Sequence, residues 1–326
     1  MADLETLGGE GGETIRCRYC GQLNSVRTQT GQARCGRCRL LLSEEPHKKF
    51  AHLDKYSYIH PLDSRALAAL KNIPGIDTAL KKLLEWTGDA AIRVIFTASA
   101  VKVTPKQCPD LYYKLQVACT TLGVDMPELF VQQNPTVNAF TGGVKRPVIV
   151  LHSQLIERLN DEEVLAVIAH EVGHIHAEHV LYITAARLIE ALTNAALAAS
   201  PVAALVTQLI SLTMRSALLA WARRAELSCD RAALLVTQDP DVIGRTMMKL
   251  CGGTFASKID YEQFLAQARD FQQNYDQKAL DRFWADIINA GLTHPFPVWR
   301  VAEILKWVEN GEYQRVMSGE PASAAA

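Results

Sequence analysis

The sequence His170-Glu171-Val172-Gly173-His174 decides how the rest of this chain is organised, because it has the form HExxH. On an α-helix, residues four apart lie on the same face, one turn above the other. The two histidines can therefore offer two imidazole nitrogens to one metal ion, and Glu171 can reach a water on that ion. Two ligands and a general base in five residues are typical of zinc hydrolases. The alternative is that the two histidines are buried in the core and hydrogen-bonded there without a metal, which would produce the same sequence pattern.

The residues before this motif predict a helix. Residues 161–169 begin with acidic side chains and continue as an apolar run. Asn160 followed by Glu163 resembles a capping box, with Asn in place of Ser or Thr. The apolar run would bury the helix, and polar side chains that are buried need partners.

A catalytic zinc site needs a third protein ligand and leaves its fourth position for water. Glu226 and Asp230 are again four apart on a helical pattern, so Glu226 can complete the site. Asp230 can accept the other ring N–H of a ligand histidine and fix its tautomer. The alternative is a solvated salt-bridge face with the neighbouring arginines, Arg223, Arg224 and Arg231. The pattern HExxHxxGxxH is absent, because Ala177 and Val180 occupy its last two positions.

HEVGH followed by ELSCDRA at residues 226–232 resembles the HtpX and type-1 CAAX prenyl protease family of zinc metalloendopeptidases, whose soluble minimal members are called minigluzincins. Two further stretches resemble family motifs. They are NAFTGG at residues 138–143 and THPFPVWR at residues 293–300. The resemblance covers residues 58 to 315, and four motifs in order are far more specific than one.

This resemblance implies an α+β, zincin-like fold, mostly helical, with a small mixed sheet beside the active-site helix. It implies a metalloendopeptidase with catalytic zinc on His170, His174 and Glu226, which hydrolyses peptide or protein substrates with Glu171 as general base.

The same resemblance implies roles for residues outside the helix pair. His294 would stabilise the oxyanion, with Arg300 beside it or supporting it. The strand containing Asn138, Ala139 and Phe140 would lie at the edge of the cleft and pair with an extended peptide. On the residues alone, an ordinary core hairpin strand explains this stretch equally well.

Four cysteines predict a second metal site. Cys17, Cys20, Cys35 and Cys38 form two CxxC pairs, which can close a tetrahedral structural zinc site in a ribbon whose metal supplies the folding free energy. This segment resembles the ribbon ahead of some bacterial thioredoxins. A redox dithiol is the alternative. The ribbon could bind a protein partner. Nearby arginines could touch nucleic acid, but a solvated surface that offsets the thiolates is the favoured interpretation; they are Arg16, Arg18, Arg34, Arg37 and Arg39.

Composition bounds the class of protein. A hydrophobic content of 48%, a charged content of 21% and a net charge of −1 are those of a soluble globular protein with no electrostatic preference for nucleic acid or anionic membrane. The acidic, glycine-rich start has no signal-peptide features, so we expect a cytoplasmic, reducing setting.

The pattern divides the chain into five parts. We expect disorder at 1–14, the ribbon at 15–42, a linker at 43–57, the metallopeptidase domain at 58–317 and a disordered tail at 318–326. Residues 91–103, rich in β-branched side chains, predict a strand. Residues 180–219 predict a helical hairpin over the site, with Ser200-Pro201 starting its second helix; peripheral membrane or dimer contact is the alternative.

A non-catalytic binding protein on a degenerate peptidase scaffold is the second functional hypothesis. A degenerate member would have lost a catalytic residue. The set His170, Glu171, His174 and Glu226 is complete, which favours an enzyme.

Overall fold

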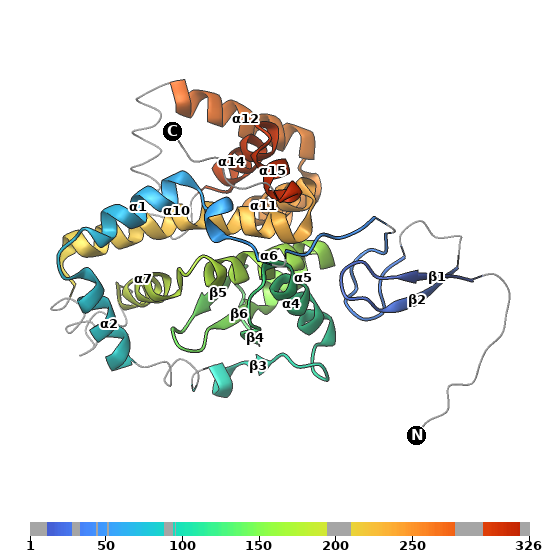
Figure 1. The fold of residues 1–326 in the computed structure, drawn as a ribbon, viewed down its shortest axis with the longest axis horizontal. Helices are drawn as coiled ribbons and strands as arrows, with labels where there is room; N and C mark the ends of the chain where they lie inside the picture. Colours follow the sequence, from blue (N-terminus) through green and yellow to red (C-terminus); the bar gives the residue numbers. More distant parts are fainter. Residues whose placement is uncertain are drawn as a thin grey trace.

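Two helices, α6 (Asp161–His176) and α10 (Leu212–Thr237), pack directly against each other at the centre of the fold (Figure 1). The computed structural model describes residues 12–27, 33–43, 45–50, 52–87, 94, 96–193, 210–277 and 296–319. In this part of the chain the protein is mostly helical with two small sheets, which confirms the predicted α+β class at that level.

Helix α6 starts at the predicted capping box. Asn160 Oδ1 accepts a hydrogen bond from the Glu163 backbone N–H at 2.9 Å, and the Glu163 carboxylate accepts one from the Asn160 N–H at 2.8 Å. Two otherwise unpaired N–H groups are satisfied, so the helix has a fixed first residue. From there its apolar residues, including the fully buried Ile168 and Val172, face the core.

Gly173 allows the two central helices to approach closely. A Cβ atom added to Gly173 would lie 2.8 Å from the Cβ of Ala232 and 3.3 Å from the Cα of Cys229, both on α10. The first distance is shorter than packed carbon atoms allow. Since the histidines of the motif flank this glycine on α6, the crossing point also brings them against α10.

A four-stranded mixed sheet lies beside α6. Its order is β3 (Val101–Lys102), β4 (Glu128–Gln132), β6 (Val148–His152) and β5 (Ala139–Gly142). Strands β4 and β6 are parallel, and the other two pairs are antiparallel. Both β5 and β6 contact α6, so the sheet lies where it was predicted. Strand β5 is at one edge of the sheet, with no strand beyond it in the described residues.

The remaining helices surround this centre (Figure 1). Helix α1 lies along α10, α4 packs on α6, and α11, α12 and α14 pack on one another. The bounds of these and the other elements are α1 Pro61–Lys71, α2 Ile76–Thr87, α4 Pro109–Leu122, α5 Ser153–Arg158, α7 Val180–Thr193, α11 Pro240–Gly252, α12 Tyr261–Gln277, α14 Pro297–Glu309 and α15 Glu312–Ser318, with short 3-10 turns at η1 Lys55–Ser57 and η2 Gly253–Lys258.

The strand predicted at 91–103 was wrong for most of the residues that can be compared. Residues 96–99 are helical, and only Val101–Lys102 forms a strand. Helical spacing places Phe96 and Ala100 together against the sheet, where the Phe96 ring lies 6.3 Å from that of Phe130 and 5.5 Å from that of Phe140. Packing against the sheet therefore overrides the local β propensity of this segment.

The ribbon contains β1 (Gly12–Arg16) and β2 (Leu23–Arg27), paired antiparallel, and the first strand begins within the range that we expected to be disordered. The stretch expected to be a linker is packed on the helical domain. His47 Nε2 lies 2.7 Å from the Val236 carbonyl oxygen, the Lys48 backbone bonds both ways with the Gln238 side chain, and Phe50 is buried.

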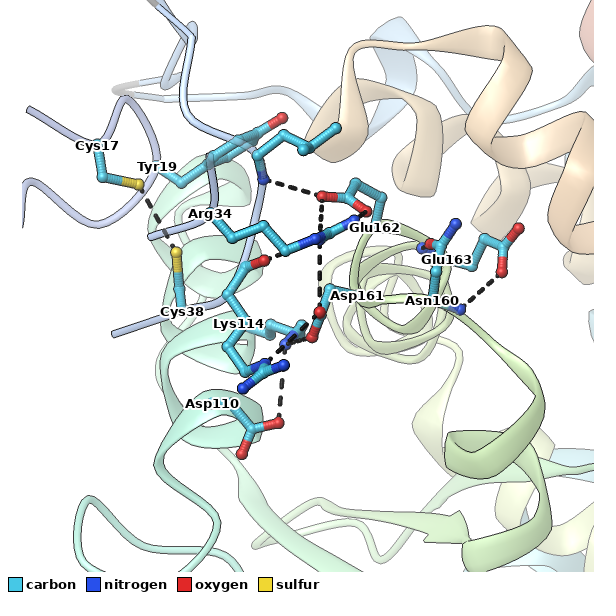
Figure 2. A network of polar contacts seen from close by, with 12 residues as sticks. Cys17, Tyr19, Arg34, Cys38, Asp110, Lys114, Asn160, Asp161, Glu162 and Glu163 are labelled. Atoms are coloured by element: carbon cyan, nitrogen blue, oxygen red, sulfur yellow. Dashed lines mark hydrogen bonds and ion pairs between the residues drawn. The ribbon is translucent and has the colours of Figure 1, made fainter. Parts of the chain in front are cut away.

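The ribbon docks on the first turn of α6 (Figure 2). Arg34 Nη1 lies 2.9 Å from a Glu162 carboxylate oxygen and 3.4 Å from Asp161, and the Leu41 N–H donates to Glu162 at 2.9 Å. Asp161 also accepts a hydrogen bond from the buried Lys114 at 2.8 Å. We expected a solvated arginine surface; Arg34 is instead a docking residue, because the acidic first turn that suits the helix dipole also attracts it.

No helix within the described ranges combines the length and the apolar character that crossing a bilayer requires. Helix α7 is the first half of the predicted hairpin. Ser200-Pro201 and most of the uncharged stretch lie outside the described residues, as do residues 1–11, residues 320–326 and His294.

We predict that Gly173→Ala destabilises the fold. Overpacking at the helix crossing costs about 1–3 kcal/mol, more than the roughly 0.5–1 kcal/mol that alanine gains over glycine in a helix. The measurement is urea unfolding at a fixed zinc concentration. Gly142→Ala is the control, because a Cβ atom there meets nothing within 4 Å. Equal unfolding midpoints for the two variants would contradict a close crossing at Gly173.

Candidate metal centre and active site

The structure brings His170, His174 and Glu226 together although the carboxylate is far away in sequence. One Glu226 oxygen lies 3.3 Å from His170 Nε2, and the other lies 3.3 Å from His174 Nε2. The three residues are buried, with His174 fully enclosed. Helix α6 supplies both imidazoles from adjacent turns, and α10 supplies the carboxylate one turn before the Gly173 crossing.

These donors fit a zinc ion. Ligand bonds of about 2.0 to 2.1 Å at a tetrahedral centre separate neighbouring ligand atoms by roughly 3.3 Å. The observed separations between the nitrogens and oxygens are 3.3 Å. In addition, His174 Nε2 is buried and has no hydrogen-bond partner among the described residues. A cation between these atoms would satisfy it. The Cys229 thiol also lies close to both imidazoles, within 4.8 Å, and is a second possible donor.

Asp230 and Arg300 hold the outer face of His170. Asp230 Oδ1 lies 3.0 Å from His170 Nδ1, and Arg300 donates two hydrogen bonds to the Asp230 carboxylate at 2.6 and 2.7 Å. Burial alone would raise the pKa of Asp230, but Arg300 outweighs it and keeps that pKa below its usual value. Burial lowers the pKa of His170, yet the carboxylates of Glu226 and Asp230 raise it to about 9. The carboxylates thus favour a positive charge at this point of the site, which a metal ion bound to the neutral imidazole would supply.

The second imidazole is backed by another histidine. His179 Nδ1 lies 3.4 Å from His174 Nδ1, and His179 Nε2 lies 3.1 Å from Asp63 Oδ2. Asp63 accepts further hydrogen bonds from Trp221 Nε1 at 2.8 Å and from the Ser228 hydroxyl at 2.6 Å. This carboxylate is therefore fixed in place, and it reaches His174 through His179. Burial lowers the pKa of His174, which favours the neutral imidazole that a metal needs.

Glu171 is held by the edge strand. The Thr141 hydroxyl lies 2.7 Å from Glu171 Oε2 and 3.0 Å from the Glu171 carbonyl oxygen. Thr141 lies in β5, so the strand beside the helix also orients the carboxylate of the motif.

A cavity of about 350 Å³ opens beside these residues. Its lining includes His170, Glu171, Glu226, and Asn138 and Ala139 from the edge-strand region. Phe140 does not line it; its side chain packs against Phe96 and against His152, with ring centroids 5.5 and 6.0 Å apart. This alternation follows from the strand, in which neighbouring side chains point to opposite faces.

Sequence reasoning missed three residues that contact the site. His179 was left without a role because it is five residues from His174, a poor match to the same helical face. Its position is explained by the end of α6, after which Glu178 adopts a left-handed backbone conformation with a φ of 60°. Asp63 and Thr141 gave no signal, apart from the NAFTGG stretch that contains Thr141. Arg300 contacts Asp230, and His294 lies outside the described residues.

The ribbon cysteines also come together. Cys17 and Cys38 sulfurs are 3.6 Å apart, as are those of Cys20 and Cys35, and all four lie within 4.8 Å of one another. Zinc–sulfur bonds of about 2.3 Å in a tetrahedron separate the sulfurs by roughly 3.8 Å. Thiol hydrogen bonds lower the pKa of Cys17 and raise those of its partners Cys20 and Cys38, so the cluster shares its protons unevenly. The spacing of the four sulfurs fits a four-cysteine zinc site.

The site defines a metallopeptidase of the HExxH class, and comparisons with known proteins agree. The family model of Peptidase family M48 matches residues 105–308. The chain is 35% identical over 294 residues to the plastoglobule-localized metallopeptidase 48, chloroplastic, of Arabidopsis thaliana. This match covers 88% of this chain and 83% of that protein. It is 24% identical over 250 residues to a protease HtpX homolog of Paraburkholderia phytofirmans, and this match covers 70% of this chain and 84% of that protein. No solved structure matches the chain.

This chain therefore belongs to peptidase family M48. It is a zinc metallopeptidase, as the resemblance of its motifs predicted, and the non-catalytic alternative is not favoured.

Proposed function

We propose that this chain is a zincin-like metalloendopeptidase in which His170, His174 and Glu226 hold the catalytic zinc. The observation that carries the proposal is the buried carboxylate with one oxygen 3.3 Å from each imidazole Nε2. Glu226 is preferred to Cys229 as third ligand because its two oxygens face both nitrogens, whereas the Cys229 sulfur lies 3.8 Å from His179 Nδ1. Held by these three residues, a zinc ion would supply Lewis-acid polarisation of the scissile carbonyl and would lower the pKa of a bound water toward neutrality.

Glu171 acts as the general base. Its carboxylate accepts a proton from the attacking water and later delivers that proton to the leaving amine. The Thr141 hydroxyl donates to Oε2, which fixes the carboxylate orientation and leaves the other oxygen for the water. Asp230 fixes the tautomer of His170, and Arg300 acts through Asp230 as a positioning residue. By resemblance, His294 stabilises the oxyanion.

The substrate is an extended peptide or protein segment that pairs with the edge of β5 that is not bonded to β6. Strand β5 bonds to β6 on one side, so its other edge offers backbone N–H and C=O groups. This edge adjoins the cavity through Asn138 and Ala139, which are the proposed backbone contacts; Phe140 contributes through the strand and not through its side chain.

The ribbon holds a structural zinc on Cys17, Cys20, Cys35 and Cys38. Its thiols bind metal only while reduced, which supports a reducing compartment such as the cytoplasm. Arg34 is engaged with α6, which leaves less of the basic surface for nucleic acid and gives the ribbon a docking role within the chain.

We predict that Glu171→Gln retains zinc and lowers kcat for casein cleavage by roughly 10²–10⁴-fold, the contribution of a general base. The measurements are zinc content and cleavage rate on the same sample. Glu262→Gln, at an exposed position on α12, serves as the control and should match the parent. A Glu171→Gln variant as active as the control would refute the proposed mechanism.

We predict that His179→Gln lowers the affinity of the catalytic site for zinc by about 10–100-fold, because it removes the group that orients His174. His176→Gln is the matched control. His176 also follows the motif closely, but its ring contacts the Tyr58 hydroxyl at 2.7 Å and the Leu53 carbonyl at 3.0 Å. Competition with a chromophoric chelator gives the affinities. The same loss in both variants would mean that general disruption, and not orientation of His174, is responsible.

We predict that the chain binds one zinc ion at each of two sites, and that the loss of one site leaves the ion at the other in place. Elemental analysis should give two zinc ions per chain in the parent, one in Glu226→Ala, one in the Cys20→Ser, Cys38→Ser double variant, and none when these changes are combined. A Glu226→Ala protein that keeps both ions would exclude Glu226 as a ligand. A double variant that keeps both would exclude the ribbon site.

A further inference from the structure

Helix α7 carries two polar side chains on the side opposite its buried apolar face. The apolar side chains belong to one buried cluster with residues of α2 and α10; they are Tyr182, Ile183, Ala185, Ala186 and Ile189. Thr184 and Arg187, one turn apart, fall on the other side of the helix, because 3.6 residues complete a turn. Helix α7 also packs against β5 (Figure 1). The two polar groups therefore lie outside the core contacts of this helix.

Arg187 reaches from α7 to the strand proposed to bind the substrate. Its guanidinium carbon lies 5.5 Å from the centroid of the Phe140 ring in β5, a cation–π contact. The side chain is partly exposed, and its Nε atom is buried without a hydrogen-bond partner. Among the described residues no carboxylate pairs with it, whereas Arg34, Arg231 and Arg300 each pair with one. A partly buried guanidinium with open donors favours an acceptor from outside the chain.

Thr184 adds a second open donor one turn away. Its side chain is buried, and its hydroxyl has no partner in the part of the chain that the structure describes. A threonine hydroxyl within a helix often donates to the carbonyl four residues back, as those of Thr121, Thr237 and Thr246 do here. Since Thr184 does not form this bond, its donor stays available on the same side of α7 as Arg187.

Strand geometry determines which substrate residue would meet Arg187. In a β ladder, directly opposite residues point to the same face, and neighbours along a strand alternate. Thr141 contacts Glu171, and Ala139 lines the cavity beside the metal ligands. The Phe140 side chain points the other way and meets Arg187. A substrate residue opposite Phe140 therefore points toward Arg187, while its two neighbours point toward the metal side.

We propose that Arg187, with Thr184 beside it, forms a subsite that binds a carboxylate of the substrate, one residue along from a residue that faces the metal side. The inference rests on the proposed peptidase function and adds a specificity-determining residue and a substrate class. The substrates are extended segments with an aspartate, a glutamate or a chain-terminal carboxylate close to the scissile bond. A carboxylate fits because the guanidinium and the hydroxyl both donate hydrogen bonds and the guanidinium supplies the opposite charge.

The test uses fluorogenic peptides with a single cleavable bond and an amidated C-terminus. Each position near the bond is changed in turn to Glu, Gln or Lys, and kcat/KM is measured. At one position, kcat/KM for the Glu peptide should exceed that for the Gln peptide by about 10-fold, the factor expected for one charge-assisted hydrogen bond. The Lys peptide should be cleaved least there. A second series with a free C-terminal carboxylate separates the two sources, because a preference seen only in that series identifies the chain end.

Variants then assign the preference to Arg187. Arg187→Gln should lower the ratio of kcat/KM for Glu over Gln peptides to about 1, and Arg187→Glu should make the Lys peptide the better substrate. Arg245→Gln is the matched control and should keep the parental ratio. Arg245 also stacks on an aromatic ring, with its guanidinium carbon 4.1 Å from the Tyr261 centroid, but it lies on α11. A ratio measured on one preparation does not depend on the fraction of folded enzyme. A parental ratio in Arg187→Gln would overturn the assignment.

Failure of the subsite and failure of the peptidase function give different results. Equal kcat/KM for Glu and Gln peptides at every position, in both series, would reject the subsite and leave the peptidase intact. If the parent cleaves none of the peptides, the proposed function fails for these substrates, and the subsite is judged by binding. Fluorescence anisotropy with zinc-loaded Glu171→Gln should then show tighter binding of the Glu peptide than of the Gln peptide. The difference should vanish when Arg187→Gln is added, and equal binding without that change would overturn the proposal.

Discussion

The close crossing of α6 and α10 at Gly173 is the constraint on which the site depends. The missing side chain lets the backbones meet at a distance that alanine could not accommodate. At that distance two imidazoles from one helix and a carboxylate from the other converge on a common point in a buried environment. Each imidazole Nε2 lies 3.3 Å from one oxygen of the carboxylate. A wider crossing would separate Glu226 from His170 and His174, and no side-chain rotation within a packed core could restore both contacts.

That crossing buries several charges, and the protein satisfies each of them with a specific partner. Asp230 is held by Arg300, and Asp63 by Trp221, Ser228 and His179. The two ligand histidines are thus supported by buried carboxylates, directly in one case and through a second imidazole in the other. A buried carboxylate without such partners would be expensive. Glu226 lies 3.6 Å from Arg300 Nη1 and also faces the two Nε2 atoms. In the proposed site a zinc ion between these atoms would therefore contribute to the charge balance of the core as well as to the chemistry.

Much of this site follows from spacing within single elements, and the sequence predicts that part well. The HExxH helix, its Asn160–Glu163 capping box and the short strand predicted at Asn138–Thr141 are local features, and each was found, the strand one residue later at Ala139–Gly142. Contacts between distant elements are different. The role of Asp63 depends on α1 lying along α10, and the helical turn at Phe96 depends on a sheet formed later in the chain. No periodicity in the sequence encodes these pairings, so hydrophobic pattern alone gave a strand where tertiary packing makes a helix.

The ribbon shows how such distant contacts connect the cysteine cluster to the helix pair that carries the HExxH motif. Arg34 binds the first turn of α6 through Glu162, while the segment after the ribbon binds the end of α10 through Val236 and Gln238. The ribbon and the segment that follows it, residues 45–50, therefore contact the start of α6 and the end of α10. Tyr19 and Leu40 belong to the same buried cluster as residues of α6 and α10. Because so small a ribbon would depend on its metal to fold, the free energy of the proposed zinc binding at the four cysteines would also support the contacts between the ribbon and the helix pair.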